Sequence, residues 1–160
     1  MISEPPATEP PEPDAGAVDR VRAMLEQDAA TAALGVEVLA LAPGRATMRM
    51  TVRPDMVQGH GTCHGGLVFA LADSAFAAAC NGRAGGPVVA ASAEITWVAP
   101  AFGGDTLVAS AVEQTRYGRN GVTDVTVTRQ GDGALLALFR GRSVEVSRPP
   151  APPATNGGPR

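Results

Sequence analysis

Residues 60–76, HGTCHGGLVFALADSAF, combine reactive side chains with a pair of glycines where a helix is predicted to begin. The first amides of a helix have no partner within the helix and carry the positive end of its dipole, so they attract a carbonyl oxygen that is becoming negative. Gly65 and Gly66 leave such amides open to a substrate because they carry no side chain. The alternative is that the glycines only make a tight turn into the helix.

Asp73 is the second candidate, because an aspartate within an alanine-rich buried helix is costly unless a partner or a function holds it. It would serve as a nucleophile or general base in a partly dry site. The alternative is a carboxylate that faces solvent or bonds to a neighbour such as Ser74. Gly65 and Asp73 lie about 12 Å apart along one helix, from the rise per residue. One carbonyl cannot meet both, so a shared site predicts two subunits, with Gly65 from one and Asp73 from the other.

Two rival sites use the same stretch. Cys63 and His64 suggest a nucleophilic pair, but adjacent residues rarely point at one another and no third group is placed to orient the histidine. With His60 they suggest zinc, but the paired-ligand spacing of zinc sites is missing. A hydratase of similar fold would need a histidine after Asp73, and none follows. We therefore predict no metal and no cofactor.

The elements that must position these residues are one long helix and six strands. Residues 65–80 are rich in alanine, lack proline and precede the helix stop NGRAGG, and they are apolar on nearly every face, which predicts a helix buried almost all round. A short amphipathic helix is expected at 17–30. Alternating patterns predict a fold of class α+β, an antiparallel sheet of five to six strands around the helix. The strand candidates are 35–42, 44–52, 87–100, 105–118, 121–130 and 133–146.

Composition sets the limits of the domain. Of 14 prolines, ten lie within 1–13 or 149–160, so we expect disordered tails at 1–16 and 148–160 and one domain at 17–147. A net charge of -3 without any Lys/Arg block predicts no nucleic-acid partner. No apolar run approaches a membrane span and the first residues are unlike a secretory signal, so we expect no membrane and a cytoplasmic location. Both cysteines are expected as free thiols.

Over about residues 30–146 the chain resembles the hotdog-fold acyl-CoA thioesterases of the phenylacetic acid degradation (PaaI) type. The resemblance is carried by three segments: GHGTCHGGLVFALADSAFAAACN, VVAASAEITWVAP and ALFRGRSVEV. The resemblance implies a hotdog fold, assembled as homodimers or homotetramers. It implies hydrolysis of a thioester such as phenylacetyl-CoA or a hydroxylated derivative. Gly65 would polarise the carbonyl, Asp73 would act as nucleophile or base, and His64 would line the site.

The chain departs from related patterns at two positions. Gln58, which we predict to belong to the catalytic residues with Gly65, His64 and Asp73, stands where the family more often carries asparagine. Ala77 stands where hydroxybenzoyl-CoA thioesterases have a hydroxyl, so that water would be held by Ser74 or a backbone group. With Gly66 and Asn81, Ser74 is predicted to contact the substrate.

Cationic and aromatic residues supply candidates for the rest of an acyl-CoA. Arginines on or between neighbouring strands are candidates for the coenzyme A phosphates, the alternative being a solvated strand face: Arg116, Arg119, Arg140 and Arg142. Possible walls of the acyl pocket, each alternatively core, are Phe69, Phe76, Trp97 and Phe102. The competing function is a module that binds acyl-CoA or acyl carrier without hydrolysis, and Asp73 argues against it.

Overall fold

The structure, a computed structural model, describes residues 16–83 and 85–147. The predicted tails lie outside these ranges, apart from Gly16. The chain order is α1 (Ala17–Glu26), α2 (Ala29–Ala33), β1 (Glu37–Ala42), β2 (Arg45–Thr51), the short 3₁₀ helix η1 (Pro54–Met56), α3 (Gly65–Asn81), β3 (Val88–Trp97), β4 (Thr106–Tyr117), β5 (Asn120–Arg129) and β6 (Leu135–Glu145).

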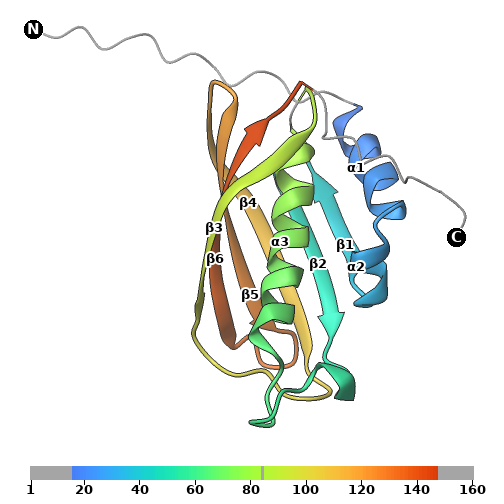
Figure 1. Cartoon of the computed structure of the whole chain (residues 1–160), viewed down its shortest axis with the longest axis vertical. Helices are drawn as coiled ribbons and strands as arrows, with labels where there is room; N and C mark the ends of the chain where they lie inside the picture. The colour runs from blue at the N-terminus through green and yellow to red at the C-terminus, as the bar shows by residue number, and fades with distance from the viewer. Residues whose placement is uncertain (1–15, 84, 148–160) are drawn as a thin grey trace, which may run out of the picture.

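The six strands form one antiparallel sheet in the order β1-β2-β4-β5-β6-β3. Figure 1 shows the sheet curving around α3, with α1 and α2 beyond β1 on one side and β3 on the other. The predicted α+β hotdog architecture and all six strand candidates are confirmed. In the part of the chain that the structure describes, no helix is long and apolar enough to cross a membrane.

The predicted N-terminal helix is divided in two, which corrects the single helix expected over 17–30. Asp28 lies between α1 and α2, and its carboxylate accepts a hydrogen bond from the amide of Thr31 at 3.0 Å. An aspartate competes for backbone donors in this way and favours the start of a helix over its interior. The chain therefore ends α1 at Glu26 and begins again at Ala29.

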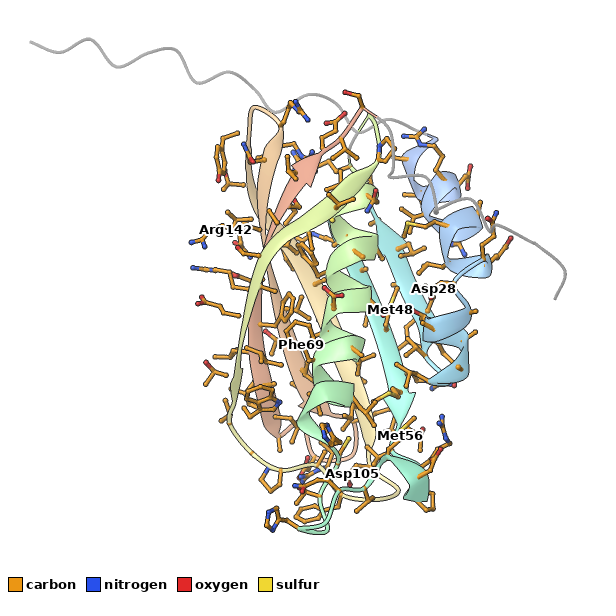
Figure 2. The ribbon with its side chains drawn as sticks, in the orientation of Figure 1. Asp28, Met48, Met56, Phe69, Asp105 and Arg142 are labelled. Carbon is orange, nitrogen blue, oxygen red and sulfur yellow. The ribbon has the colours of Figure 1, made fainter. Side chains whose placement is uncertain are left out.

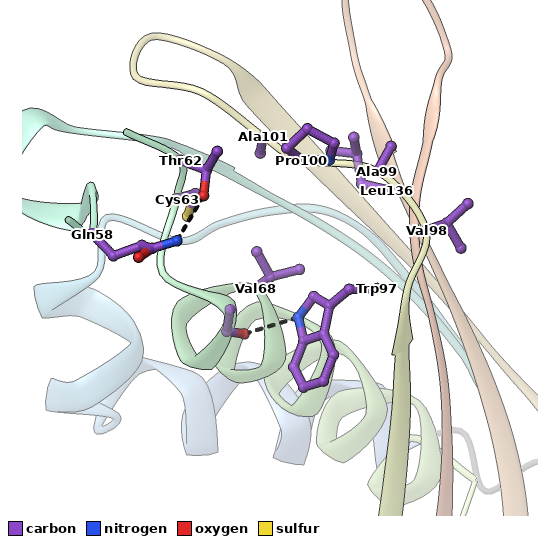
Figure 3. Close-up of a pocket in the computed structure, with 11 residues that line it drawn as sticks. Gln58, Thr62, Cys63, Val68, Trp97, Val98, Ala99, Pro100, Ala101 and Leu136 are labelled. Atoms are coloured by element: carbon purple, nitrogen blue, oxygen red, sulfur yellow. Dashed lines mark hydrogen bonds between the residues drawn. The ribbon is translucent and has the colours of Figure 1, made fainter. Parts of the chain in front are cut away.

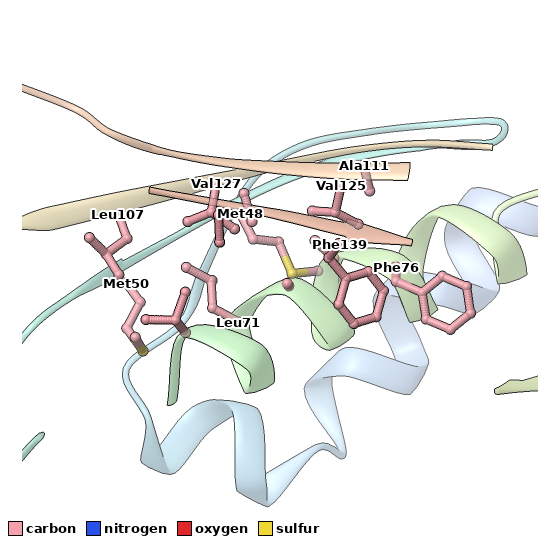
Figure 4. Packing of buried hydrophobic residues seen from close by; sticks show 14 of the residues in the cluster. Met48, Met50, Leu71, Phe76, Leu107, Ala111, Val125, Val127 and Phe139 are labelled. Atoms are coloured by element: carbon pink, nitrogen blue, oxygen red, sulfur yellow. The ribbon is translucent and has the colours of Figure 1, made fainter. Parts of the chain in front are cut away.

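The core lies between α3 and the inner face of the sheet, and it follows the period of two in each strand. Met48 and Met50 of β2 are fully buried, and Leu71 and Phe76 of α3 belong to the same cluster (Figure 4). Gly141 makes room for the helix, because a Cβ atom there would lie 2.5 Å from the ring of Phe76. This close approach requires glycine at the position.

One side of α3 is not covered by the chain itself, so the prediction of burial almost all round is wrong for the single subunit. Gly66 is exposed and Ala70, Asp73 and Ala77 are half-buried. These four residues follow helical spacing and form what we call the open stripe of α3. The curved sheet packs against α3 most extensively through β2, β4 and β5, which leaves this side free. The stripe carries one ionisable group, Asp73.

Candidate active site

The loop before α3 is fixed by backbone hydrogen bonds to its surroundings. The amide of His64 donates to the carbonyl of Met56 at 2.9 Å, and the amide of Cys63 donates to that of Ala101 at 2.8 Å. Gly61 has a φ of 81°, a left-handed conformation that glycine adopts at little cost. The start of α3 is therefore held against the connection between β3 and β4.

Gly65 presents the free amide of the first turn. The amide of Gly66 donates to Nδ1 of His64 at 3.0 Å, so His64 caps the helix with its side chain. The amides of Leu67 and Val68 donate to the carbonyl of His64 at 2.9 and 3.4 Å. Within the described residues no acceptor faces the N–H of Gly65. Of the two predicted glycines, Gly65 is the one whose amide is available to a substrate, while the amide of Gly66 is engaged.

A cavity of about 360 Å³ adjoins this amide. Its walls come from the loop before α3, the first turn of α3, the end of β3 with the connection that follows, and β6 (Figure 3). The lining residues are Gln58, Thr62, Cys63, Gly65, Val68, Trp97, Val98, Ala99, Pro100, Ala101 and Leu136. Most are apolar, which suits the acyl part of a thioester.

Among the predicted aromatic walls, only Trp97 lines this cavity. Phe76 is buried in the core, and Phe69 packs edge-on against Phe139 with ring centroids 5.3 Å apart. Phe102 is 48% exposed. Three of the four candidates thus lie outside the cavity. The sequence did not distinguish aromatic residues of the cavity wall from those of the core or the surface.

Asp73 is half-buried on the open stripe, and burial raises the pKa of its carboxyl group above the ordinary value. No hydrogen bond or ion pair to this carboxylate is present among the described residues. A carboxylate in such surroundings is a better proton acceptor than one in water. Since α3 is a continuous helix from Gly65 to Asn81, the separation of about 12 Å from Gly65 applies.

Cys63 and His60 do not extend the site into a nucleophilic or metal centre. Burial raises the pKa of the Cys63 thiol, which disfavours the reactive thiolate. Its sulfur donates weakly to the His64 carbonyl at 3.7 Å, and His60 is exposed at the loop tip. No three His, Cys, Asp or Glu side chains in the described ranges group to hold a metal ion. Cys63 and Cys80 are free thiols, as predicted.

Three other predicted polar residues have defined partners. Gln58 lines the cavity, and its Nε2 donates to the hydroxyl of Thr62 at 2.9 Å. The Ser74 hydroxyl lies 3.1 Å from that of Thr31, so it faces α2. Asn81 exchanges hydrogen bonds with the backbone of Val88 at 2.9 and 3.0 Å, which ties the end of α3 to β3. The catalytic role of Gln58 and the contact of Ser74 and Asn81 with substrate stay predictions. The sequence analysis did not identify Thr62 as the hydrogen-bond partner of Gln58 and a lining residue of the cavity, although the two residues are only four positions apart.

Arg116 points inward rather than to a solvated strand face. It donates to Glu113 at 2.7 Å and to the carbonyl of Cys80 at 3.0 Å, at the opposite end of α3 from Gly65. The register between β4 and β5 shifts between Glu113 and Thr115. Such a bulge changes which face the following side chains occupy, so Arg116 joins Glu113 on the inner side.

The remaining arginines lie nearer the surface. Arg119 donates to the carbonyl of Glu145 at 2.9 and 2.8 Å. Arg140 holds Asp124 with two hydrogen bonds of 2.6 and 2.8 Å. Arg142 is exposed on the side of the sheet away from α3 (Figure 2). The assignment of these side chains to coenzyme A phosphates stays a prediction.

Comparison with known proteins gives consistent matches. Residues 60–135 match the thioesterase superfamily. The chain is 42% identical over 124 residues to acyl-coenzyme A thioesterase PaaI of Escherichia coli (strain K12), covering 78% of this chain and 87% of that protein. It is 32% identical over 107 residues to acyl-coenzyme A thioesterase 13 of Homo sapiens, covering 66% and 76%.

Solved structures agree. The E. coli PaaI protein from the phenylacetic acid degradation operon superposes with a TM-score of 0.78 at 41% identity, over 81% of this chain and 93% of that one. A mutant of phenylacetic acid degradation protein PaaI from Thermus thermophilus gives 0.69 at 43% identity, over 72% and 97%. The predicted resemblance is confirmed: the chain belongs to the thioesterase superfamily, and its enzyme class is thioester hydrolase.

Proposed function

We propose that the protein hydrolyses an aryl acyl-CoA, such as phenylacetyl-CoA or a hydroxylated derivative, to free coenzyme A and a carboxylic acid. The observation that carries the proposal is the unpartnered amide of Gly65 at the edge of a largely apolar cavity. The relative from E. coli is an acyl-coenzyme A thioesterase, which supports a coenzyme A ester as the substrate.

In the reaction we propose, the thioester carbonyl oxygen accepts a hydrogen bond from the N–H of Gly65. Asp73 removes a proton from water, whose oxygen attacks the carbonyl carbon, and the negative charge that forms on the carbonyl oxygen is stabilised by the amide. The carbon–sulfur bond then breaks, and the leaving sulfur receives the proton held by Asp73. In the alternative route the Asp73 carboxylate attacks first, and water hydrolyses the resulting anhydride.

We further propose that each site uses two copies of the chain in a homodimer or homotetramer. The separation of about 12 Å along α3 means that one carbonyl cannot reach both groups of a single helix. Two surfaces support a second copy: the open stripe that carries Asp73, and β3 at the edge of the sheet, exposed from Ala90 to Glu94. Val98, directly after β3, adds an exposed apolar side chain at 51%.

The test is an assay of thiol release on a panel of aryl, short-chain and long-chain acyl-CoAs. We expect turnover that is fastest with aryl substrates and unchanged by EDTA. Saturable binding without turnover of any substrate would instead identify a non-catalytic acyl-CoA binding protein. Activity lost with EDTA and restored by zinc would contradict the proposed mechanism.

A further inference from the structure

Trp97 is in direct contact with Gly65, whose amide we propose to bind the carbonyl oxygen of the thioester. Its indole Nε1 donates a hydrogen bond to the carbonyl oxygen of Gly65 at 3.3 Å, across 32 positions of sequence. Figure 3 shows the indole beside the first turn of α3, with this hydrogen bond drawn as a dashed line to the helix. Trp97 therefore links the end of β3 to the start of α3.

The indole also limits the space beside the backbone of residue 65. Gly65 does not have a positive φ, so its backbone conformation is open to other residues. A Cβ atom at this position would lie 3.0 Å from Nε1 and 3.2 Å from Cε2 of Trp97. A side chain at position 65 would therefore require the indole to shift by a few tenths of an ångström, because the ring packs directly against the backbone of the helix start.

Trp97 lines the cavity as well, where it is the one aromatic residue among the lining side chains. In the single chain Trp97 is 54% exposed, and its ring forms part of the cavity wall. The other cavity walls near it are aliphatic or small, among them Val68, Leu136 and Ala99. An aromatic ligand gains ring-on-ring contact from Trp97 that a linear chain cannot match.

We propose that Trp97 determines acyl specificity, selecting aryl over linear acyl groups by contact with the ring, and that it positions Gly65 through the carbonyl hydrogen bond. The inference rests on the proposed function, because it assigns the cavity to the acyl group. The two roles separate chemically. Phenylalanine at position 97 keeps an aromatic wall but lacks the N–H donor, whereas leucine keeps neither.

The first experiment compares phenylacetyl-CoA with octanoyl-CoA, whose acyl groups have the same number of carbons. For Trp97→Leu we expect the ratio of kcat/KM, aryl over linear, to fall about three- to tenfold from the lost ring contact. For Trp97→Phe we expect the ratio to be kept while kcat falls about fivefold on both substrates, from the lost hydrogen bond. Tyr117→Leu is the matched control, since Tyr117 is equally exposed at 54% but does not line the cavity.

The second experiment needs no turnover. Trp97 is the one tryptophan of the chain, so intrinsic fluorescence reports on this position. In Asp73→Asn, titration with phenylacetyl-CoA should change the emission saturably, and free coenzyme A should change it little. Binding of phenylacetyl-CoA seen by calorimetry with no change in emission would overturn the proposal.

An equal loss on both substrates in Trp97→Leu, with the ratio unchanged, would also overturn the specificity role and leave Trp97 a structural residue. Failure of the proposed function has a different signature. In that case the wild-type chain hydrolyses neither substrate, and the fluorescence titration still decides whether the acyl group lies against Trp97.

Discussion

Nη2 of Arg116 lies 2.7 Å from Oε1 of Glu113, and the Glu113 side chain has no exposed surface. The pair links β4 to the end of α3 that lies opposite the candidate site, because Arg116 also donates a hydrogen bond to the Cys80 carbonyl. Oε2 of Glu113 and Nη1 of Arg116 are buried without a hydrogen-bond partner among the described residues. Two longer ion pairs add to this contact: Arg83 lies 3.9 Å from Oε2 of Glu113, and Glu145 lies 3.7 Å from Nη1 of Arg116.

Loss of one member of this pair should destabilise the fold. In Glu113→Gln the Arg116 charge keeps only its longer contact with Glu145 at 3.7 Å, and we expect the free energy of unfolding to fall by about 1–3 kcal/mol, measured by urea denaturation. Arg140→Gln is the matched control. It breaks the pair with Asp124 at the surface, where water replaces the lost contact, so the unfolding midpoint should barely move. Equal shifts in the two variants would contradict the distinction.

Asp73 should set opposite pH dependences for activity and stability. Burial raises its pKa, and the base must be ionised, so kcat/KM should fall on acidification at a higher pH than an exposed aspartate would give. Asp73→Asn should lower kcat about 10²- to 10⁴-fold. A pH–rate profile with its acidic limb at the position of an exposed aspartate would count against this role.

For stability the sign is reversed. A raised pKa in the folded state favours the protonated acid, so this contribution to stability is present at low pH and is lost as pH rises through the folded-state pKa. At neutral pH the buried carboxylate therefore destabilises the fold, and Asp73→Asn should unfold at higher urea than wild type. The gain should disappear on acidification. An unchanged or lower midpoint at neutral pH would show that the carboxylate is compensated.

Complementation tests the two-subunit site. Asp73→Asn removes the base, and Gly65→Val places a side chain against Trp97 and the amide, so each variant alone should be nearly inactive. Co-refolding equal amounts should restore about a quarter of wild-type activity, given random pairing into dimers with two symmetric sites. The control is mass spectrometry of subunit exchange. A mixture that exchanges subunits yet stays inactive would refute the shared site.

Two variants at position 64 should distinguish the role of His64 as a helix cap from its predicted contact with substrate. His64→Ala removes the acceptor for the Gly66 amide and should cost about 1 kcal/mol of unfolding free energy. His64→Asn restores an acceptor and should recover that stability. Neither replacement supplies the imidazole, so both should lose kcat/KM on phenylacetyl-CoA to a similar extent. Full recovery of activity in His64→Asn would reduce the residue to a cap.

The strands and the central helix could be predicted because local pattern decides them. Ala46, Met48 and Met50 alternate along β2 and are all buried, and the helix begins at Gly65 as its composition indicated. The division at Asp28 was missed because the side chain competes with the helix for backbone donors.

The site was only partly predictable, because its details depend on contacts between distant segments. Gly65 and Gly66 look equivalent in sequence, and only the orientation of the His64 ring shows which amide is free. Trp97 reaches Gly65 from another element of the fold. The sequence pattern of β4 is compatible with a surface position for Arg116, but the bulge in this strand places its side chain on the inner face, beside Glu113.

β3 is a sheet edge of ten residues, with β6 as its one partner strand in the described part of the chain. An exposed edge of this length is a template on which another chain can add a strand, and it favours aggregation. In the two-copy site that we propose, a second subunit would shield this edge while it delivers the missing catalytic group. Dilution that separates the copies would then abolish hydrolysis and, at the same time, expose the β3 edge to pairing with other chains.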